Sequence, residues 1–132
     1  MKVVEVVAAL ISRQGEVLVQ RRPPEKTRGM LWEFPGGKRE PEESAKVALA
    51  RECHEELGVT VEVEEELWAT KHRYNDLEVH LQLYRTKVIA GEPEPREGQD
   101  LRWVLPADLP GMPFVEADVP VLKLIAHGDI TL

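Results

Sequence analysis

The sequence has few aromatic residues, a single cysteine and no long apolar run. The last two features each exclude a class of protein. Cys53 has no second cysteine with which to form an internal disulfide, and it cannot build a thiolate zinc site alone. This usage is typical of a reducing compartment, so we expect a cytoplasmic location. No apolar stretch approaches the roughly 20 residues that a membrane-spanning helix needs, so we expect no membrane partner.

The sequence also lacks an excess of positive charge. Its 17 Lys and Arg residues are outnumbered by 24 Asp and Glu residues, and the formal net charge of −7 argues against a nucleic-acid polymer as ligand. A free nucleotide remains compatible, because a bound metal ion would invert the local field. Six basic residues nevertheless gather in one short stretch: Arg21, Arg22, Lys26, Arg28, Lys38 and Arg39. They are either solvated surface charges or contacts for a polyphosphate.

The length and the order of the elements predict one domain over residues 1–132 with a mixed α/β fold. We expect strands at 3–12, 16–21, 31–34, 59–71, 77–89 and 101–105, with a turn at 14–15 and loops at 23–30 and 91–100. One helix should begin between Pro41 and Ser44 and end at Gly58, and another should cover 119–127. This order favours a mixed sheet packed between helices.

Three glutamates dominate the first of these helices. Glu52, Glu55 and Glu56 are three and four residues apart, so they should share a helical face, and like charges this close repel unless a cation neutralises them. Oxygen-rich clusters of this kind suit hard divalent cations such as Mg²⁺. The alternative is an ordinary solvated acidic face. The opposite face should pack in the core through Ala45, Ala48, Leu49 and Cys53.

Two other motifs fail on inspection. Gly36-Gly37-Lys38 resembles a fragment of a P-loop, but Arg39 follows where Ser or Thr is required. The pair His54-Glu55 would need a second histidine at position 58 to form a zinc-protease site, and glycine is present there. Neither a P-loop nor a zinc-protease motif is therefore present.

The segments at 37–43 and 51–59 together resemble the signature of the Nudix hydrolases. They read Gly37-Lys38-Arg39-Glu40-Pro41-Glu42-Glu43 and Arg51-Glu52-Cys53-His54-Glu55-Glu56-Leu57-Gly58-Val59, and every fixed position of that signature is filled. Cys53 departs from the larger aliphatic residue usual in the family. The resemblance implies an α/β/α sandwich with the signature as a loop-helix-loop. It also implies attack of water on a phosphorus of a nucleoside diphosphate linked to another group.

The resemblance implies roles for the residues of the signature. Glu52, Glu55 and Glu56 would be ligands of Mg²⁺, with Mn²⁺ as the alternative metal, and the carbonyl of Gly36 would add a backbone oxygen. Glu43 and Arg51, expected about two helical turns apart, would orient Glu52. The alternative for this pair is an ordinary ion pair within the helix.

The general base is left open between two glutamates. Glu52 is the first expectation. The loop Arg96-Glu97-Gly98-Gln99 resembles one that joins the active site in nucleoside triphosphate pyrophosphohydrolases, which makes Glu97 the alternative base and a further metal ligand. A general base must lie within hydrogen-bond reach of the attacking water.

Segments outside the signature are similar to the MutT branch, which cleaves (d)NTPs to NMP and pyrophosphate. These are residues 20–23, 32–38 and 117–120. The resemblance implies that Arg22 contacts phosphate, that Phe34 lines the base pocket and that Asp118 reads the base edge. It also assigns Gly37 and Lys38 to substrate binding. The alternative for Phe34 is plain core packing.

Asp118 leaves the base open, because related enzymes for oxidised guanine carry Asn there. An ionised Asp only accepts hydrogen bonds, which suits the N1 and N2 groups of guanine or the amino group of cytosine. If buried, Asp118 would be protonated and regain a donor. The first expected substrate is 8-oxo-dGTP, which implies nucleotide-pool sanitation in support of DNA repair, and the alternative is CTP or a modified dCTP.

A third hypothesis belongs to another functional class. A catalytically silent Nudix-fold module would only bind a nucleotide or a protein, since a fold alone does not establish an activity. Such a module would be expected to lose a signature glutamate, and all of them are present. We therefore expect an enzyme that acts on a small-molecule nucleotide.

Overall fold

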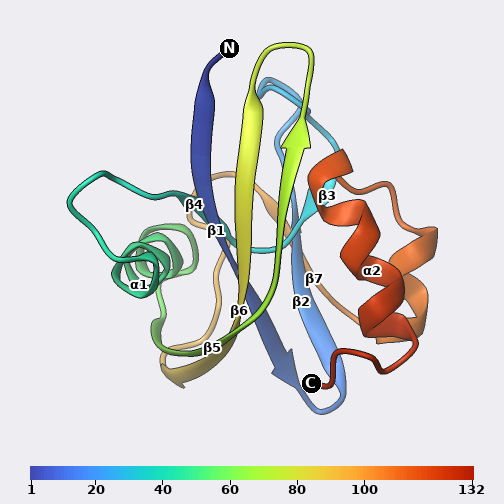
Figure 1. Cartoon of the computed structure of the whole chain (residues 1–132). Helices are drawn as coiled ribbons and strands as arrows, with labels where there is room; N and C mark the ends of the chain where they lie inside the picture. The colour runs from blue at the N-terminus through green and yellow to red at the C-terminus, as the bar shows by residue number, and fades with distance from the viewer.

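The computed structural model describes residues 1–132 as a seven-stranded sheet with two α-helices and two short 3₁₀ helices (Figure 1). In chain order the elements are β1 (Val3–Arg13), β2 (Glu16–Arg21), β3 (Trp32–Glu33), β4 (Gly36–Lys38), α1 (Ala45–Leu57), β5 (Thr60–Arg73), β6 (Glu78–Ala90), β7 (Asp100–Val104), η1 (Pro106–Gly111), η2 (Glu116–Asp118) and α2 (Val119–Ala126). Neither α-helix has the length and apolar character needed to cross a lipid bilayer.

The sheet is mixed, as the sequence predicted. Its main path runs β3-β2-β1-β6-β5, while β4 pairs with β1 and β7 with β2. β1 and β6 are parallel, with Val3 opposite Glu78 and Ile11 opposite Thr86, and the other pairings are antiparallel. A parallel pair needs a long crossover connection, and the chain between β1 and β6 includes α1.

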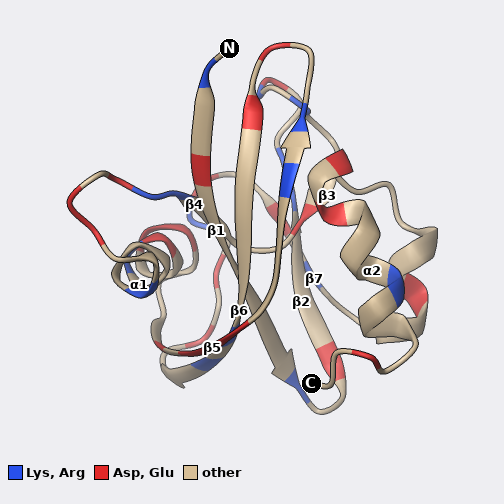
Figure 2. Cartoon of the chain, viewed as in Figure 1, with Lys and Arg blue, Asp and Glu red and all other residues tan.

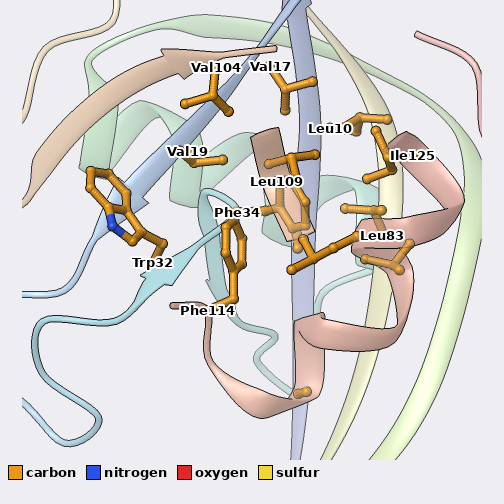
Figure 3. Packing of buried hydrophobic residues seen from close by; sticks show 14 of the residues in the cluster. Leu10, Val17, Val19, Trp32, Phe34, Leu83, Val104, Leu109, Phe114 and Ile125 are labelled. Atoms are coloured by element: carbon orange, nitrogen blue, oxygen red, sulfur yellow. The ribbon is translucent and has the colours of Figure 1, made fainter. Parts of the chain in front are cut away.

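Two apolar layers cover the two faces of the sheet. Successive side chains of a strand point to opposite faces. Ala8 and Leu10 of β1 therefore join the cluster that contains α2 and η1 residues, shown in Figure 3, whereas Val7, Ala9 and Ile11 join the cluster that contains α1. In Figure 1, α1 and α2 lie on opposite sides of the sheet. The expected α/β/α sandwich is confirmed.

Helix α1 begins later than the sequence predicted. Its N-cap is Ser44, whose Oγ accepts a hydrogen bond from the amide of Val47 at 3.2 Å, and residues 41–43 form a turn outside the helix. The N-cap hydroxyl supplies an acceptor that Pro41 lacks, which explains the shift. The predicted stop is correct: Gly58 is left-handed, with φ of 71°, and donates its amide to the carbonyl of His54.

Strand β4 was not predicted from the sequence, because a Pro-Gly-Gly run has low strand propensity. It pairs with β1, placing Gly36 opposite Ala8 and Lys38 opposite Val6. Gly36 has φ of 154°, and a β-carbon there would collide with the carbonyl oxygen of Val7. Glycine is thus required where the strand passes closest to β1, and this pairing brings residues 36–38 beside α1.

Candidate active site

Glu52 and Glu56 lie on the side of α1 that meets β4. Glu56 is only 5% exposed and Glu52 is partly buried. A β-carbon on Gly37 would collide with the carboxylate of Glu52, so this glycine permits the close approach of α1 to β4. In Figure 2, acidic residues of α1 lie near the basic segment that leads from β4 toward the helix.

A polar pocket with a volume of ≈ 180 Å³ opens beside these two glutamates. The exposed side chain of Glu97 reaches its wall from the loop before β7, so the structure brings this glutamate to Glu52 and Glu56. Gly36 and Gly37 also line it. The charged residues of the wall are Arg22, Lys26, Glu33, Glu52, Glu56 and Glu97.

The neighbouring carboxyl groups of Glu52 and Glu56 favour binding of a cation between them. Burial is the main cause that raises the pKa of Glu56 well above its ordinary value, and the neighbouring Glu52 carboxylate adds to it. A divalent cation between such groups would favour their ionised forms, and carboxylate oxygens are the ligands that Mg²⁺ and Mn²⁺ prefer. The donor set therefore fits a hard divalent cation.

Glu55 does not join the other two. Its side chain is 49% exposed and accepts a hydrogen bond from Arg51 Nη1 at 3.3 Å, outside the polar pocket. Successive helical residues point about 100° apart, so Glu55 and Glu56 diverge although both are near Glu52 in sequence. No three acidic, His or Cys side chains are gathered as a complete metal-binding group. Glu55 therefore lies outside the polar pocket that Glu52 and Glu56 line, and its role as a metal ligand stays a prediction.

Arg51 joins the turn before α1 to Glu52. Its guanidinium donates to both carboxylate oxygens of Glu43, at 2.7 and 2.8 Å, to Glu52 Oε1 at 3.0 Å and to the carbonyl of Lys38 at 3.1 Å. The hydrogen bonds from Arg51, then that from the Glu40 amide, lower the pKa of Glu43 to about 2. The predicted spacing of two helical turns is wrong, because Glu43 precedes the helix and folds back onto it.

Two buried amides complete the polar pocket, and the sequence analysis assigned a role to neither, although both lie in segments that it named. Gln20 and Gln99 are 4% and 6% exposed. Gln20 Nε2 donates to Glu56 Oε1 at 2.8 Å, and Gln99 Nε2 donates to the Glu56 carbonyl at 3.0 Å. The amide of Glu97 donates to Gln99 Oε1 at 2.8 Å. The available signal was Gln20 itself, an uncharged polar residue that directly follows the apolar run at 17–19 of β2.

A second, more apolar pocket of ≈ 200 Å³ adjoins the first. Its wall includes Phe34 and Asp118, both predicted, and the unpredicted Tyr74, whose hydroxyl accepts from the amide of Ala117 at 2.9 Å. Lys38 lies at its wall as well. The two pockets share Arg22, Glu33, Gly36 and Gly37.

Phe34 and Asp118 meet at the wall of this apolar pocket. Phe34 is buried against Phe114, with ring centroids 5.4 Å apart (Figure 3), so its two interpretations, core packing and pocket wall, both hold. Burial is the main cause that raises the pKa of Asp118 to about 8, and the charge of Glu33 adds to it. At neutral pH the carboxyl is mostly protonated, so it both donates and accepts hydrogen bonds.

The basic stretch is divided between the pockets and the surface. Arg22 lies at the junction of the two pockets, where Nη1 donates to Glu33 Oε1 at 3.1 Å. The guanidinium of Arg28 lies 3.7 Å from the centre of the Tyr74 ring at the apolar pocket. Arg21 instead pairs with Asp100 at the surface. The prediction of phosphate contact therefore applies to the basic residues of this stretch that line one of the two pockets.

The sequence matches the NUDIX domain family over residues 6–124. It is 38% identical over 123 residues to a CTP pyrophosphohydrolase of Escherichia coli, covering 93% of this chain and 91% of that protein. It is 39% identical over 119 residues to a putative 8-oxo-dGTP diphosphatase 2 of Mycobacterium tuberculosis, covering 86% of this chain and 81% of that protein.

The fold has solved counterparts. The crystal structure of a MutT protein from Methanosarcina mazei superposes with a TM-score of 0.85 at 25% sequence identity, covering 98% of this chain and 97% of that one. The likeness therefore extends over nearly the whole chain, including the elements that form both pockets.

Proposed function

From the premise that the chain belongs to the Nudix hydrolase family, we propose that it is a Mg²⁺-dependent nucleoside triphosphate pyrophosphohydrolase. It would hydrolyse a (d)NTP to the (d)NMP and pyrophosphate, with 8-oxo-dGTP as its preferred substrate. Its cellular role would then be sanitation of the nucleotide pool, which supports DNA repair.

The continuity of the two pockets carries this proposal. One pocket is acidic and polar, the other is largely apolar, and they share Arg22, Glu33, Gly36 and Gly37. A nucleoside triphosphate has the same division, with a flat base at one end and charged phosphates at the other. The base would enter the apolar pocket, and Arg22 would contact the phosphates at the junction. Gly37 and Lys38 would complete the substrate contacts.

The metal would be held by oxygen ligands at the polar pocket. Glu52, Glu56 and Glu97 line this pocket and are the proposed ligands, together with the carbonyl of Gly36 and with Glu55. When bound, Mg²⁺ clamps phosphate oxygens and lowers the pKa of bound water, and Mn²⁺ is the alternative. Because Glu52 and the buried Glu56 are already close, the protein gathers two of the proposed ligands before the metal binds.

One glutamate must accept a proton from the attacking water. In the proposed reaction the water oxygen forms a bond to phosphorus and the bond from that phosphorus to the bridging oxygen between the α- and β-phosphates breaks, which gives the monophosphate and pyrophosphate. Glu52 is our first choice of base, because Arg51 holds it at 3.0 Å and thereby fixes its orientation. Glu97, on an exposed loop, is the alternative base.

Asp118 is the proposed reader of the base. A neutral carboxyl group presents a donor and an acceptor side by side, as the amide of Asn does. In 8-oxoguanine, N7 carries a hydrogen and O6 accepts, which complements this pair. The protonated state of Asp118 would therefore replace the Asn found in related enzymes for oxidised guanine.

A cytosine nucleotide is the second candidate. The observation that favours it is the similarity to the Escherichia coli CTP pyrophosphohydrolase, which extends over 93% of this chain. A neutral Asp118 would complement cytosine too, because it accepts from the N4 amino group and donates to N3. Hydrogen bonding alone therefore leaves both bases compatible, and the kinetics must separate them.

The test is a comparison of initial rates with Mg²⁺ at low micromolar substrate. The panel contains 8-oxo-dGTP, dGTP, CTP, dCTP and 5-methyl-dCTP, and pyrophosphate and phosphate are assayed separately. We expect the largest kcat/KM for 8-oxo-dGTP, with pyrophosphate as product. A preference for a cytosine nucleotide would transfer the assignment to the second candidate.

The same assay separates an enzyme from a silent binding module. If no nucleotide of the panel is hydrolysed, or if phosphate is released in place of pyrophosphate, the proposed reaction is wrong. Chelation of the metal should abolish turnover, and added Mg²⁺ should restore it.

A further inference from the structure

We propose that Gln20 is a positioning residue that sets the metal affinity of the site through the carboxylate of Glu56. The inference rests on the proposed function, because it concerns the same metal ligands. It adds a residue outside the segments that hold the glutamates: Gln20 lies on β2 and is 36 positions from Glu56.

The hydrogen bonds of the Gln20 side chain carry this inference. Its Nε2 donates to Glu56 Oε1 at 2.8 Å and to Glu33 Oε2 at 3.1 Å. A side-chain amide has two N–H donors, so both hydrogens are used by carboxylates. The side chain is 4% exposed, and water has little access to compete for these bonds. One buried amide therefore holds two acidic groups of the site.

A second amide fixes the orientation of the first. Gln20 Oε1 accepts from Gln99 Nε2 at 3.4 Å, and the same Gln99 nitrogen donates to the Glu56 carbonyl at 3.0 Å. If the Gln20 amide were reversed, its oxygen would face two carboxylates and its nitrogen would face a donor. The opposite orientation is therefore excluded by both contacts. Since Gln99 Oε1 accepts from the amide of Glu97, this chain of bonds reaches the proposed metal-binding loop.

A neutral donor is the appropriate group at this position. A Lys or Arg would neutralise Glu56 and compete with a divalent cation for it. An amide fixes the direction of the carboxyl group through one oxygen and adds no positive charge to the site. Without that donor, Glu56 Oε1 would lose the hydrogen bond from Gln20 while it faces the carboxyl groups of Glu52 and Glu33. Outer hydrogen-bond partners of metal ligands typically change metal affinity or activity by about 10–100-fold.

The test is the affinity of the substrate-free protein for Mn²⁺, measured by electron paramagnetic resonance of the free ion. We expect Gln20→Met, which keeps a long flexible side chain but has no donor, to weaken Mn²⁺ binding by about 10–100-fold. The matched control is Gln82→Met. Gln82 lies partly buried on β6, donates to Tyr84 Oη at 3.2 Å and lines neither pocket, so its variant should bind Mn²⁺ as the wild type does.

Unfolding curves of the metal-free proteins show whether each variant is folded, so a loss of Mn²⁺ affinity caused by a misplaced carboxyl group is distinguished from one caused by a less stable protein. The proposal is overturned if folded Gln20→Met binds Mn²⁺ as tightly as the wild type, or if Gln82→Met loses the same affinity. If Gln20→Met does not fold, Gln99→Met replaces it. That variant removes the contact that orients Gln20, so we expect it to weaken Mn²⁺ binding several-fold, and unchanged binding would overturn the proposal equally.

The failure of this inference differs from the failure of the proposed function. If the wild type binds Mn²⁺ and Gln20→Met does not, the positioning role stands even if no nucleotide of the panel is hydrolysed. If nucleotides are hydrolysed and the variant binds Mn²⁺ normally, only the positioning role falls. In the active protein, the Mg²⁺ concentration for half-maximal rate should rise in Gln20→Met more than the KM for nucleotide.

Discussion

The backbone amide of Phe34 donates a hydrogen bond to Oδ2 of Asp118 at 3.3 Å, across 84 positions of the chain. This contact joins the segment before β4 to the segment before α2 at the wall of the apolar pocket. It is the hydrogen bond that the Asp118 carboxyl group accepts inside the protein. Apart from this bond the group is surrounded by protein, and its pKa is raised. The titration of Asp118 should therefore affect stability as well as base recognition.

The contribution of Asp118 to stability should decrease as the pH rises from about 4 to about 8. Burial raises the pKa of Asp118 from 3.8 to about 8, so the folded state binds more protons than the unfolded state between these values. The stabilisation is complete below pH 4 and is lost as the pH passes through 8. Asp118→Asn cannot titrate, so its stability relative to the wild type should increase over this range. Denaturant unfolding of both proteins at pH 5 and pH 8 measures this difference.

Other groups also titrate between pH 5 and pH 8, and the comparison with Asp118→Asn cancels those that the substitution leaves unchanged. The control is Asp108→Asn, because Asp108 is exposed in η1. Its stability relative to the wild type should be the same at both pH values. An equal difference at pH 5 and pH 8 for Asp118→Asn would show that Asp118 is ionised throughout.

Glu56→Gln should lose activity and gain stability in the absence of metal. The substitution removes a buried carboxyl whose ionisation is disfavoured by burial and by Glu52, and it keeps a similar shape, so the cost of ionising the site disappears together with the proposed metal ligand. We expect kcat to fall by at least about 100-fold, the upper range for mere partners of metal ligands. Steady-state kinetics and thermal unfolding with chelator measure both effects.

The matched control for this prediction is Glu42→Gln. Glu42 is exposed in the turn before α1 and lines neither pocket. Its variant should have wild-type activity and stability. If Glu56→Gln retained wild-type turnover, the assignment of Glu56 as a metal ligand would be incorrect.

Arg51 and Glu43 should be energetically coupled. Their two hydrogen bonds hold Arg51 where it also contacts Glu52, and a Lys cannot reproduce this two-point geometry. A double-mutant cycle with Arg51→Lys and Glu43→Gln should give a coupling energy in unfolding that favours the folded state. Both single variants should lower kcat more than they change KM, because neither residue lines either pocket. Additive effects would show that the pair is an ordinary surface contact.

Local sequence signals predicted the elements whose boundaries depend on nearby residues. The hairpin turn at Gln14 and Gly15 is correct, and both residues have positive φ, as a tight two-residue turn requires. The stop of α1 at Gly58 depends on one left-handed glycine and is also correct. The mixed sheet followed from the order of strands and helices.

Features that depend on distant segments were not predictable in this way. β4 exists because it pairs with β1, about thirty positions earlier, and not because Pro-Gly-Gly favours a strand. Gln20 and Gln99 meet across 79 positions, and no local pattern marks them as partners. The rotation of Glu55 away from the pocket follows from the contact of α1 with β4 and from its bond to Arg51.

Gly37→Ala should damage the site and spare the fold. The added β-carbon would collide with the carboxylate of Glu52, so either this side chain must turn away or α1 must shift from β4. Both movements disrupt the proposed metal ligands, and we expect Mn²⁺ affinity and kcat to fall together by at least about 10-fold. Gly111→Ala is the matched control, because nothing lies within 4 Å of its added β-carbon. If Gly37→Ala binds Mn²⁺ with wild-type affinity, the close approach of Glu52 to β4 has no part in metal binding, and Glu52 would have to act elsewhere in the reaction.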